Sequence, residues 1–247
     1  MEVYQPTLFV PTYQPVQNGD WEVRIAPMVL CKGYWSPARL CLNMAGLVRR
    51  EADGSMRTWM SMTPMEIESQ ELGCLFASGH VLVMGMGMGW AVANSALRPE
   101  VTRVTVVERD PAVLSMIATL DIFSQLPDAA RAKIHIVEGD ALVYVPDQPV
   151  DLLMPDIWLP LINDERVEQV RQMAENCRPK QIYFWGQEME IARHARAWGC
   201  GWDAAGIKAT VERFGLPLLI PEGVDYPAKL SAAADHWMQD RWLPAAA

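Results

Sequence analysis

The feature that most constrains this chain is a set of three glycines directly after an apolar segment. Residues 81–90 read VLVMGMGMGW, with glycine at every second position from Gly85 to Gly89. A short apolar run before a glycine cluster is typical of a buried strand that ends in a turn. Because glycine has no side chain, the backbone at Gly85, Gly87 and Gly89 can approach another group closely. We therefore expect a ligand-binding turn between this strand and a helix that begins near Trp90.

Strand-like and helix-like segments alternate from this point onward. We expect strands at 81–84, 101–108, 133–139, 150–156 and 181–185, and helices at 90–98, 111–120, 164–177, 188–198, 203–213 and 227–242. Short apolar strands that alternate with helices predict a parallel sheet covered on both faces. The expected fold class is therefore α/β, a Rossmann-like, doubly wound and mostly parallel sheet.

The N-terminal part has a different pattern. Residues 1–20 are rich in Pro, Gln and Tyr without periodicity, which indicates an irregular arm. Residues 21–60 contain strand-like stretches, and Asp53-Gly54 between two of them is a hairpin turn signal. We expect residues 1–77 to hold the arm, the β-hairpin strands and a lead-in helix, and residues 78–247 to hold the sheet. The apolar hairpin strands need a partner surface, so we also expect a homodimer.

The lead-in helix is expected after Pro64, which suits a first helical turn. Thr63 is its expected cap, and Gly79 is expected to end it. Glu66 and Glu68 lie within it. A solvated helix face is the favoured reading of these two acids, and a substrate entrance is the alternative.

Acidic residues follow two of the expected strands. Glu108 ends the second strand, nineteen residues after Gly89, where a carboxylate can accept both hydroxyls of a ribose. Asp140 follows the third strand, where it can accept a hydrogen bond from an adenine amino group. The structural alternatives are a solvent-facing Glu108 and an N-cap at Asp140. NAD and S-adenosyl-L-methionine (SAM) both suit glycines followed by an acid, but the third glycine of the dinucleotide pattern GxGxxG would fall on Trp90.

The composition narrows the classes of function. With 21 basic and 30 acidic residues the formal charge is −9, which disfavours nucleic acid as a partner. No apolar run approaches the ~18 residues of a membrane span. The first residues lack the basic and apolar regions of a signal peptide. The 5 cysteines form no CxxC and the 4 histidines show no metal spacing, so we expect reduced thiols, no metal site and a cytoplasmic protein.

Together, VLVMGMGMG, VTVVERDP, IHIVEGDA and VDLLMPDIW resemble a class I SAM-dependent methyltransferase domain, particularly its spermidine synthase-like branch. The resemblance covers roughly residues 45–186, including the hairpin and the lead-in helix. It implies that the glycine turn contacts the amino-acid part of SAM, that Glu108 holds the ribose, and that Asp140 with Ala141 reads the adenine. The expected cofactor site comprises Gly85, Met86, Gly87, Gly89, Glu108, Arg109, Asp140, Ala141 and Asp156.

Two departures from that branch bear on the chemistry. Spermidine synthases have an acid within the glycine turn, at the position of Met88 in this chain. They also have a DxxD pair of acids after the fourth strand, and the second acid of that pair falls on Leu159 here. The first acid of that pair matches Asp156. A methionine tolerates the carboxylate of intact SAM, which an aspartate would repel. The resemblance therefore favours methyl transfer from SAM over aminopropyl transfer from decarboxylated SAM.

The expected reacting centre is Asp156 with Trp158. Asp156 would orient an amine or hydroxyl of a small-molecule substrate or take its proton, and Trp158 would wall the site or face a cation. The structural alternatives are a turn cap and a core tryptophan. Gln187 and Glu188 are weaker candidates at another strand end. Two further functions stay open: an aminoalkyl transferase or cyclase, and a nucleoside-binding protein without catalysis.

Overall fold

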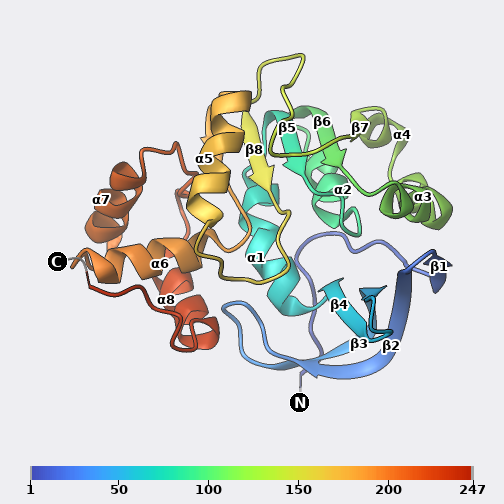
Figure 1. The fold of residues 1–247 in the computed structure, drawn as a ribbon, viewed down its shortest axis with the longest axis horizontal. Coiled ribbons are helices and arrows are strands. Elements are labelled where there is room, and N and C mark those ends of the chain that lie inside the picture. The colour runs from blue at the N-terminus through green and yellow to red at the C-terminus, as the bar shows by residue number, and fades with distance from the viewer. Residues whose placement is uncertain (1, 246–247) are drawn as a thin grey trace.

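The computed structural model describes residues 2–245, which form two sheets with helices packed around the larger one (Figure 1). The smaller sheet is antiparallel in the order β1-β2-β3-β4, with β1 at Val16–Asn18, β2 at Trp21–Cys31, β3 at Arg39–Arg50 and β4 at Met56–Ser61. The larger sheet is parallel in the order β7-β6-β5-β8-β9, with β5 at Gly79–Met84, β6 at Val101–Glu108, β7 at Ile134–Glu138, β8 at Leu152–Pro155 and β9 at Gln181–Ile182.

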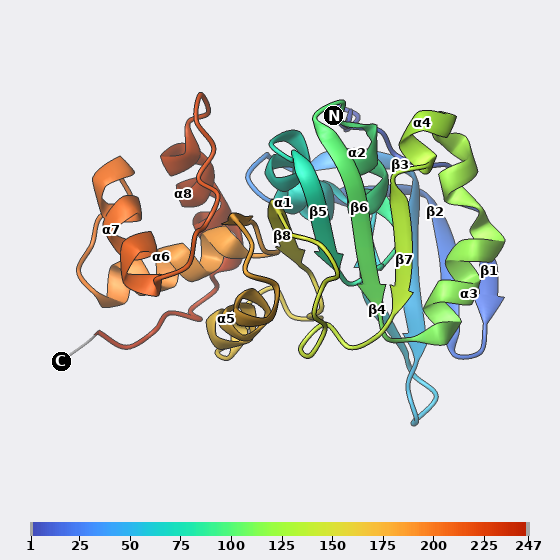
Figure 2. The same ribbon diagram turned by 90° about the horizontal axis from the view of Figure 1, so that it is seen from above.

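The helices connect the parallel strands and extend the fold beyond them. They are α1 (Pro64–Leu75), α2 (Trp90–Leu97), α3 (Pro111–Leu120), the 3₁₀-helix η1 (Ile122–Gln125), α4 (Asp128–Arg131), α5 (Arg166–Cys177), α6 (Gln187–Ala197), α7 (Ala204–Phe214) and α8 (Tyr226–Trp237). Figure 2 shows α3 and α4 near the β7 edge and α6, α7 and α8 gathered beyond β8 and α5. Within residues 2–245 the helices are too short or too polar for a membrane span.

The strand order makes this a Rossmann-like, doubly wound fold, as the sequence predicts. The chain moves from β5 outward to β6 and β7, then returns to the other side of β5 for β8 and β9. The direction therefore reverses between β5 and β8, and such a reversal leaves a crevice at the carboxyl ends of the two strands. The β5 side chains Val81 to Met84 are at most 2% exposed, so the core runs through the strand that borders this crevice.

Most expected boundaries lie within two or three residues of the observed ones, but four expectations on the fold are wrong. The lead-in helix ends at Leu75, and Gly79 instead begins β5 with a positive φ of 63°, beside Asp151. The last strand of the larger sheet stops at Ile182, although backbone bonds to β8 continue as far as Trp185. The closing helix ends at Trp237 rather than at residue 242. The arm also contains the short strand β1.

The expectation that Glu66 and Glu68 form a solvated face is also wrong. Both side chains are buried, at 7% and 4% exposure. The loop between β2 and β3 covers α1, and Glu68 Oε2 accepts hydrogen bonds from the backbone N–H groups of Trp35 and Ser36 at 3.0 and 3.1 Å. Glu68 therefore anchors that loop, because a buried carboxylate needs such donors.

We predict that Gly73→Ala destabilises the contact between α1 and the larger sheet. A Cβ at Gly73 would lie 2.7 Å from Tyr183 Cδ1 and 2.8 Å from Met154 Cε, both in the core. Overpacking of this kind costs about 1–3 kcal/mol, which exceeds the helix propensity gained from alanine. The matched control is Gly46→Ala, whose Cβ would meet its nearest atom at 3.8 Å. Urea unfolding should show a loss for Gly73→Ala alone, and equal stabilities would contradict the packing described.

Candidate active site

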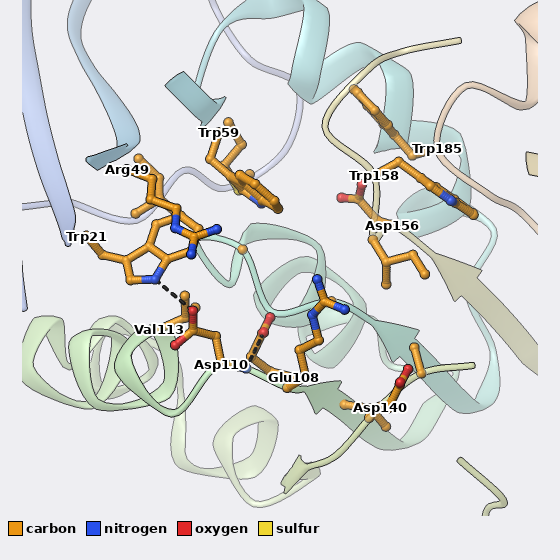
Figure 3. Close-up of a pocket in the computed structure, with 18 of the residues that line it drawn as sticks. Trp21, Arg49, Trp59, Glu108, Asp110, Val113, Asp140, Asp156, Trp158 and Trp185 are labelled. Atoms are coloured by element: carbon orange, nitrogen blue, oxygen red, sulfur yellow. Dashed lines mark hydrogen bonds between the residues drawn. The ribbon is translucent and has the colours of Figure 1, made fainter. Parts of the chain in front are cut away.

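A cavity of about 970 Å³, counting its open mouth, lies between the two sheets (Figure 3). Its floor is formed by the residues that follow β5, β6, β7 and β8, at the crevice where the strand order reverses. Its roof comes from the smaller sheet and consists of Trp21, Leu47, Arg49, Trp59 and Met60.

The glycine turn forms the centre of the floor. Gly85 has φ of 102°, and a Cβ there would overlap the carbonyl oxygen of Asp156 at the end of the neighbouring strand. Gly87 has φ of 49°, and its Cβ would overlap the sulfur of Met60. Both glycines line the cavity. Gly89 does not: it caps α2, and its Cβ would lie 2.5 Å from Ile122 Cδ1, so its contacts are with packing side chains.

Glu108 lines the cavity with both carboxylate oxygens fixed by backbone donors. Oε2 accepts from the N–H of Met86 at 3.0 Å. Oε1 accepts from the N–H of Asp110 at 2.9 Å, a bond that Figure 3 shows. Each carboxylate oxygen has a second lone pair, so two further donors from a ligand can be accepted. The Met86 side chain is buried and lines a smaller chamber behind the turn, whereas the exposed Arg109 lines the main cavity.

Asp140 and Ala141 line the cavity beside Glu108. The backbone N–H of Gly139 donates to the Glu108 carbonyl at 2.9 Å, which holds the ends of β6 and β7 together. Asp140 Oδ1 accepts from the N–H of Leu142 at 2.9 Å. This is a local turn at the cavity edge, and the carboxyl group remains exposed.

Asp156 lies at the opposite end of the floor. Its Oδ2 accepts from the side-chain amide of Gln70 at 2.9 Å. Burial is the main cause that raises the pKa of Asp156 to about 7; the charge of Arg166 and the Gln70 bond oppose this rise, and the charge of Glu108 adds to it. Near neutral pH the group therefore exists in both protonation states, which suits proton transfer.

Glu66 joins Asp156 at this end of the cavity, and the sequence does not reveal this. Burial, and then the nearby charge of Asp156, raise the pKa of Glu66 well above its ordinary value, so two acids with raised pKa values meet at this end of the cavity. The helix that carries Glu66 is buried on nearly all sides, so its sequence gives no amphipathic pattern from which the direction of this side chain could be read.

The wall beside Asp156 consists of Trp158 and Trp185. The indole N–H of Trp158 donates to Gln169, and that of Trp185 donates to Ser69 Oγ at 2.9 Å. The guanidinium carbon of Arg166 lies 4.5 Å from the centre of the Trp158 ring and 5.1 Å from that of Trp185. The cation that faces Trp158 is therefore one of the protein's own side chains.

The roof is joined to the floor by a hydrogen bond between the two sheets. The indole N–H of Trp21 donates to Asp110 Oδ2 at 2.8 Å, directly after β6 (Figure 3). Trp59 meets Trp21 edge-on with ring centres 5.3 Å apart, and Arg49 lies 5.3 Å over the Trp21 ring. None of these roof residues follows from the sequence pattern, since their position depends on how the two sheets pack.

Gln187, Glu188 and Met88, which the sequence analysis also names, lie outside the cavity as well. Gln187 and Glu188 are fully buried, and Glu188 accepts from the hydroxyls of Tyr34 and Tyr183 at 3.1 and 2.9 Å. Met88 is also fully buried, so its side chain does not meet a ligand in the cavity. Its carbonyl accepts from the Tyr13 hydroxyl at 3.0 Å.

No protein-family model and no curated protein sequence matches the chain. Among solved structures, it is similar to a glycopeptide N-methyltransferase, MtfA, complexed with S-adenosyl-L-homocysteine (SAH), at 20% identity and a TM-score of 0.36 over 44% of this chain and 43% of the other. It is also similar to the methyltransferase domain of bacterial CtHen1-C, at 18% identity and a TM-score of 0.37 over 47% and 63%. The complex of DhpI with SAH matches at 17% identity and a TM-score of 0.32 over 44% and 48%. The chain thus spans less than two thirds of the length of each.

We predict that Asp156 makes the protein less stable as the pH rises from about 4 to about 7. A carboxyl group whose pKa is raised on folding holds its proton in the native state after the unfolded state has released it, so unfolding becomes easier as pH rises. Asp156→Asn should keep the Gln70 contact and reduce this decline in urea unfolding across the pH series. Asp140→Asn, at an exposed position on the same cavity, should leave the decline as in wild type. An unchanged decline in Asp156→Asn would contradict the assigned burial.

Proposed function

We propose that the chain is a SAM-dependent methyltransferase that acts on an amine or hydroxyl of a small molecule. The observation that carries the proposal is the Glu108 carboxylate, held by two backbone N–H groups at the carboxyl end of β6, next to the strand β5 that borders the crevice of a doubly wound sheet. An acid at this place suits the two hydroxyls of a ribose. Asp140 and Ala141 lie next to it and would hold the adenine.

The amino-acid end of SAM would lie over Gly85 and Gly87, whose lack of side chains keeps this part of the floor open. No basic side chain is required there, because the turn precedes α2 and backbone N–H groups at a helix start favour a carboxylate. The methyl group would then point toward the end of the cavity that holds Asp156 and the two tryptophans.

SAM supplies a methyl group on a sulfonium, and displacement at that carbon requires an aligned nucleophile and the exclusion of water. Trp59 from the roof and Trp158 and Trp185 from the wall provide apolar surfaces for both tasks. Asp156 accepts the proton that leaves the acceptor nitrogen or oxygen.

We predict that SAM and SAH bind with micromolar affinity, whereas decarboxylated SAM and NAD bind more weakly. Glu108→Gln should weaken SAM and SAH at least tenfold, because hydrogen bonds to a charged group are worth about 1.5–3 kcal/mol each. The matched control is Glu138→Gln, which pairs with Glu108 across β6 and β7 but lies outside the cavity lining. Calorimetric titration measures all of these affinities.

Binding of neither SAM nor SAH would overturn the proposal. A preference for decarboxylated SAM would replace it with aminoalkyl transfer, and methylthioadenosine rather than SAH as the product would identify that reaction.

We predict that Asp156→Asn still binds SAM, more weakly because the charge that faces the sulfonium is lost, and that it lowers turnover at saturating SAM by about 100-fold or more, since a positioned general base contributes roughly 10²–10⁴. A panel of amines, phenols and acids with SAH formation as the readout would first identify an acceptor. Asp140→Asn, which changes an acid at the adenine end, should instead raise the KM for SAM with little loss of kcat. Full turnover in Asp156→Asn would remove Asp156 from the chemistry.

A further inference from the structure

Arg166 is a buried cation directly behind the cavity wall. Its side chain has 0% exposure, which is rare for an arginine. Nη1 donates to the carbonyl oxygens of Leu161 at 2.8 Å and Trp185 at 2.6 Å, and Nη2 donates to the carbonyl of Pro160. These carbonyls belong to two separate segments, the connection after β8 and the turn after β9. One guanidinium therefore joins the two segments that carry Trp158 and Trp185.

The surrounding chain is shaped around this guanidinium. Gly186 has φ of 79°, and a Cβ there would lie 2.5 Å from Arg166 Nη1 and 2.8 Å from the Leu161 carbonyl oxygen. The planar guanidinium also stacks on both indoles, at 4.5 and 5.1 Å. Lysine offers neither the planar stacking nor the fixed fork of donors, so the arrangement is specific to arginine.

The charge of Arg166 acts on the cavity as well. Burial lowers its pKa to about 10, while the charges of Glu190 and Asp156 raise it, so the group stays positive at neutral pH. Asp156 faces Glu66 and Gln70 from α1, Glu108 from β6 and Arg166 from α5. Arg166 is the positive group in this set, and it favours the ionised form of Asp156.

We propose that Arg166 is a positioning residue of the site: its guanidinium fixes the indoles of Trp158 and Trp185 as one preformed wall, and its charge keeps Asp156 ready to accept a proton. A buried charge usually costs stability relative to an apolar side chain, so a functional reason for keeping one is expected here. The inference rests on the proposed use of this cavity for SAM, and it adds a role that none of the cavity-lining residues performs.

The test compares Arg166→Met and Arg166→Lys with wild type in titrations of SAM and SAH between about pH 5 and pH 9. SAM carries a positive sulfonium and SAH does not. The affinity for SAM relative to that for SAH should therefore fall as the pH is lowered and Asp156 becomes protonated. In Arg166→Met the pH at the midpoint of this change in relative affinity should rise by about one unit, because loss of a nearby positive charge raises the pKa of a carboxyl group. Arg166→Lys should keep the midpoint but weaken SAH about tenfold, because the indole wall loses its anchor.

Arg193→Met is the matched control. Arg193 is also buried, at 3% exposure, and pairs with Glu190 and Asp164 away from the wall. Its loss should lower stability while leaving the midpoint within half a pH unit of wild type. An unmoved midpoint in Arg166→Met would overturn the proposal.

If Arg166→Met does not fold, the proposal would instead be overturned by an Arg166→Lys variant that binds SAH as tightly as wild type. Failure of the wild type to bind either nucleoside would refute the SAM site itself, which is a separate outcome.

Discussion

The close approach of Gly85 to the carbonyl of Asp156 is the constraint on which the rest of the structure depends. It occurs where the strand order reverses, between β5 and β8. A side chain at Gly85 would push the two loops apart and open the floor of the cavity. With glycine there, the turn after β5 also brings the Met86 N–H to Glu108 at 3.0 Å. One missing side chain thus positions the acids at both ends of the floor.

The smaller sheet completes the site instead of standing apart from it. The Trp21–Asp110 hydrogen bond of 2.8 Å joins β2 to the start of α3, and the sulfur of Met60 lies over Gly87 and accepts from the N–H of Met88 at 3.1 Å. The larger sheet supplies the polar groups suited to a nucleoside, and the smaller sheet supplies the aromatic roof. This division explains why the sequence pattern predicts the polar floor, which follows a general fold pattern, and does not predict the aromatic roof.

The sequence predicts the sheet and the glycine turn well because both depend on local patterns. Glu108 ends, and Asp140 follows, a strand that the sequence pattern identifies, and parallel strands place their carboxyl ends at one edge of the sheet. Glu66 was not predictable in the same way, since α1 is covered on nearly all sides and its buried acids look like solvated ones in the sequence. The positions of Arg166 and Trp59 depend on contacts between separate segments of the chain. Because arginine is rarely fully buried, the sequence also gives no reason to expect Arg166 in the interior.

The most direct test of the account is a crystal structure of the protein grown with SAH. The account predicts a nucleoside whose ribose hydroxyls donate to Glu108, whose adenine lies beside Asp140, and whose sulfur faces the end that holds Asp156, beneath Trp59 of the smaller sheet. A nucleoside bound elsewhere, or a cavity that remains empty at saturating SAH, would contradict the claim that the contact between Gly85 and Asp156 builds a cofactor site.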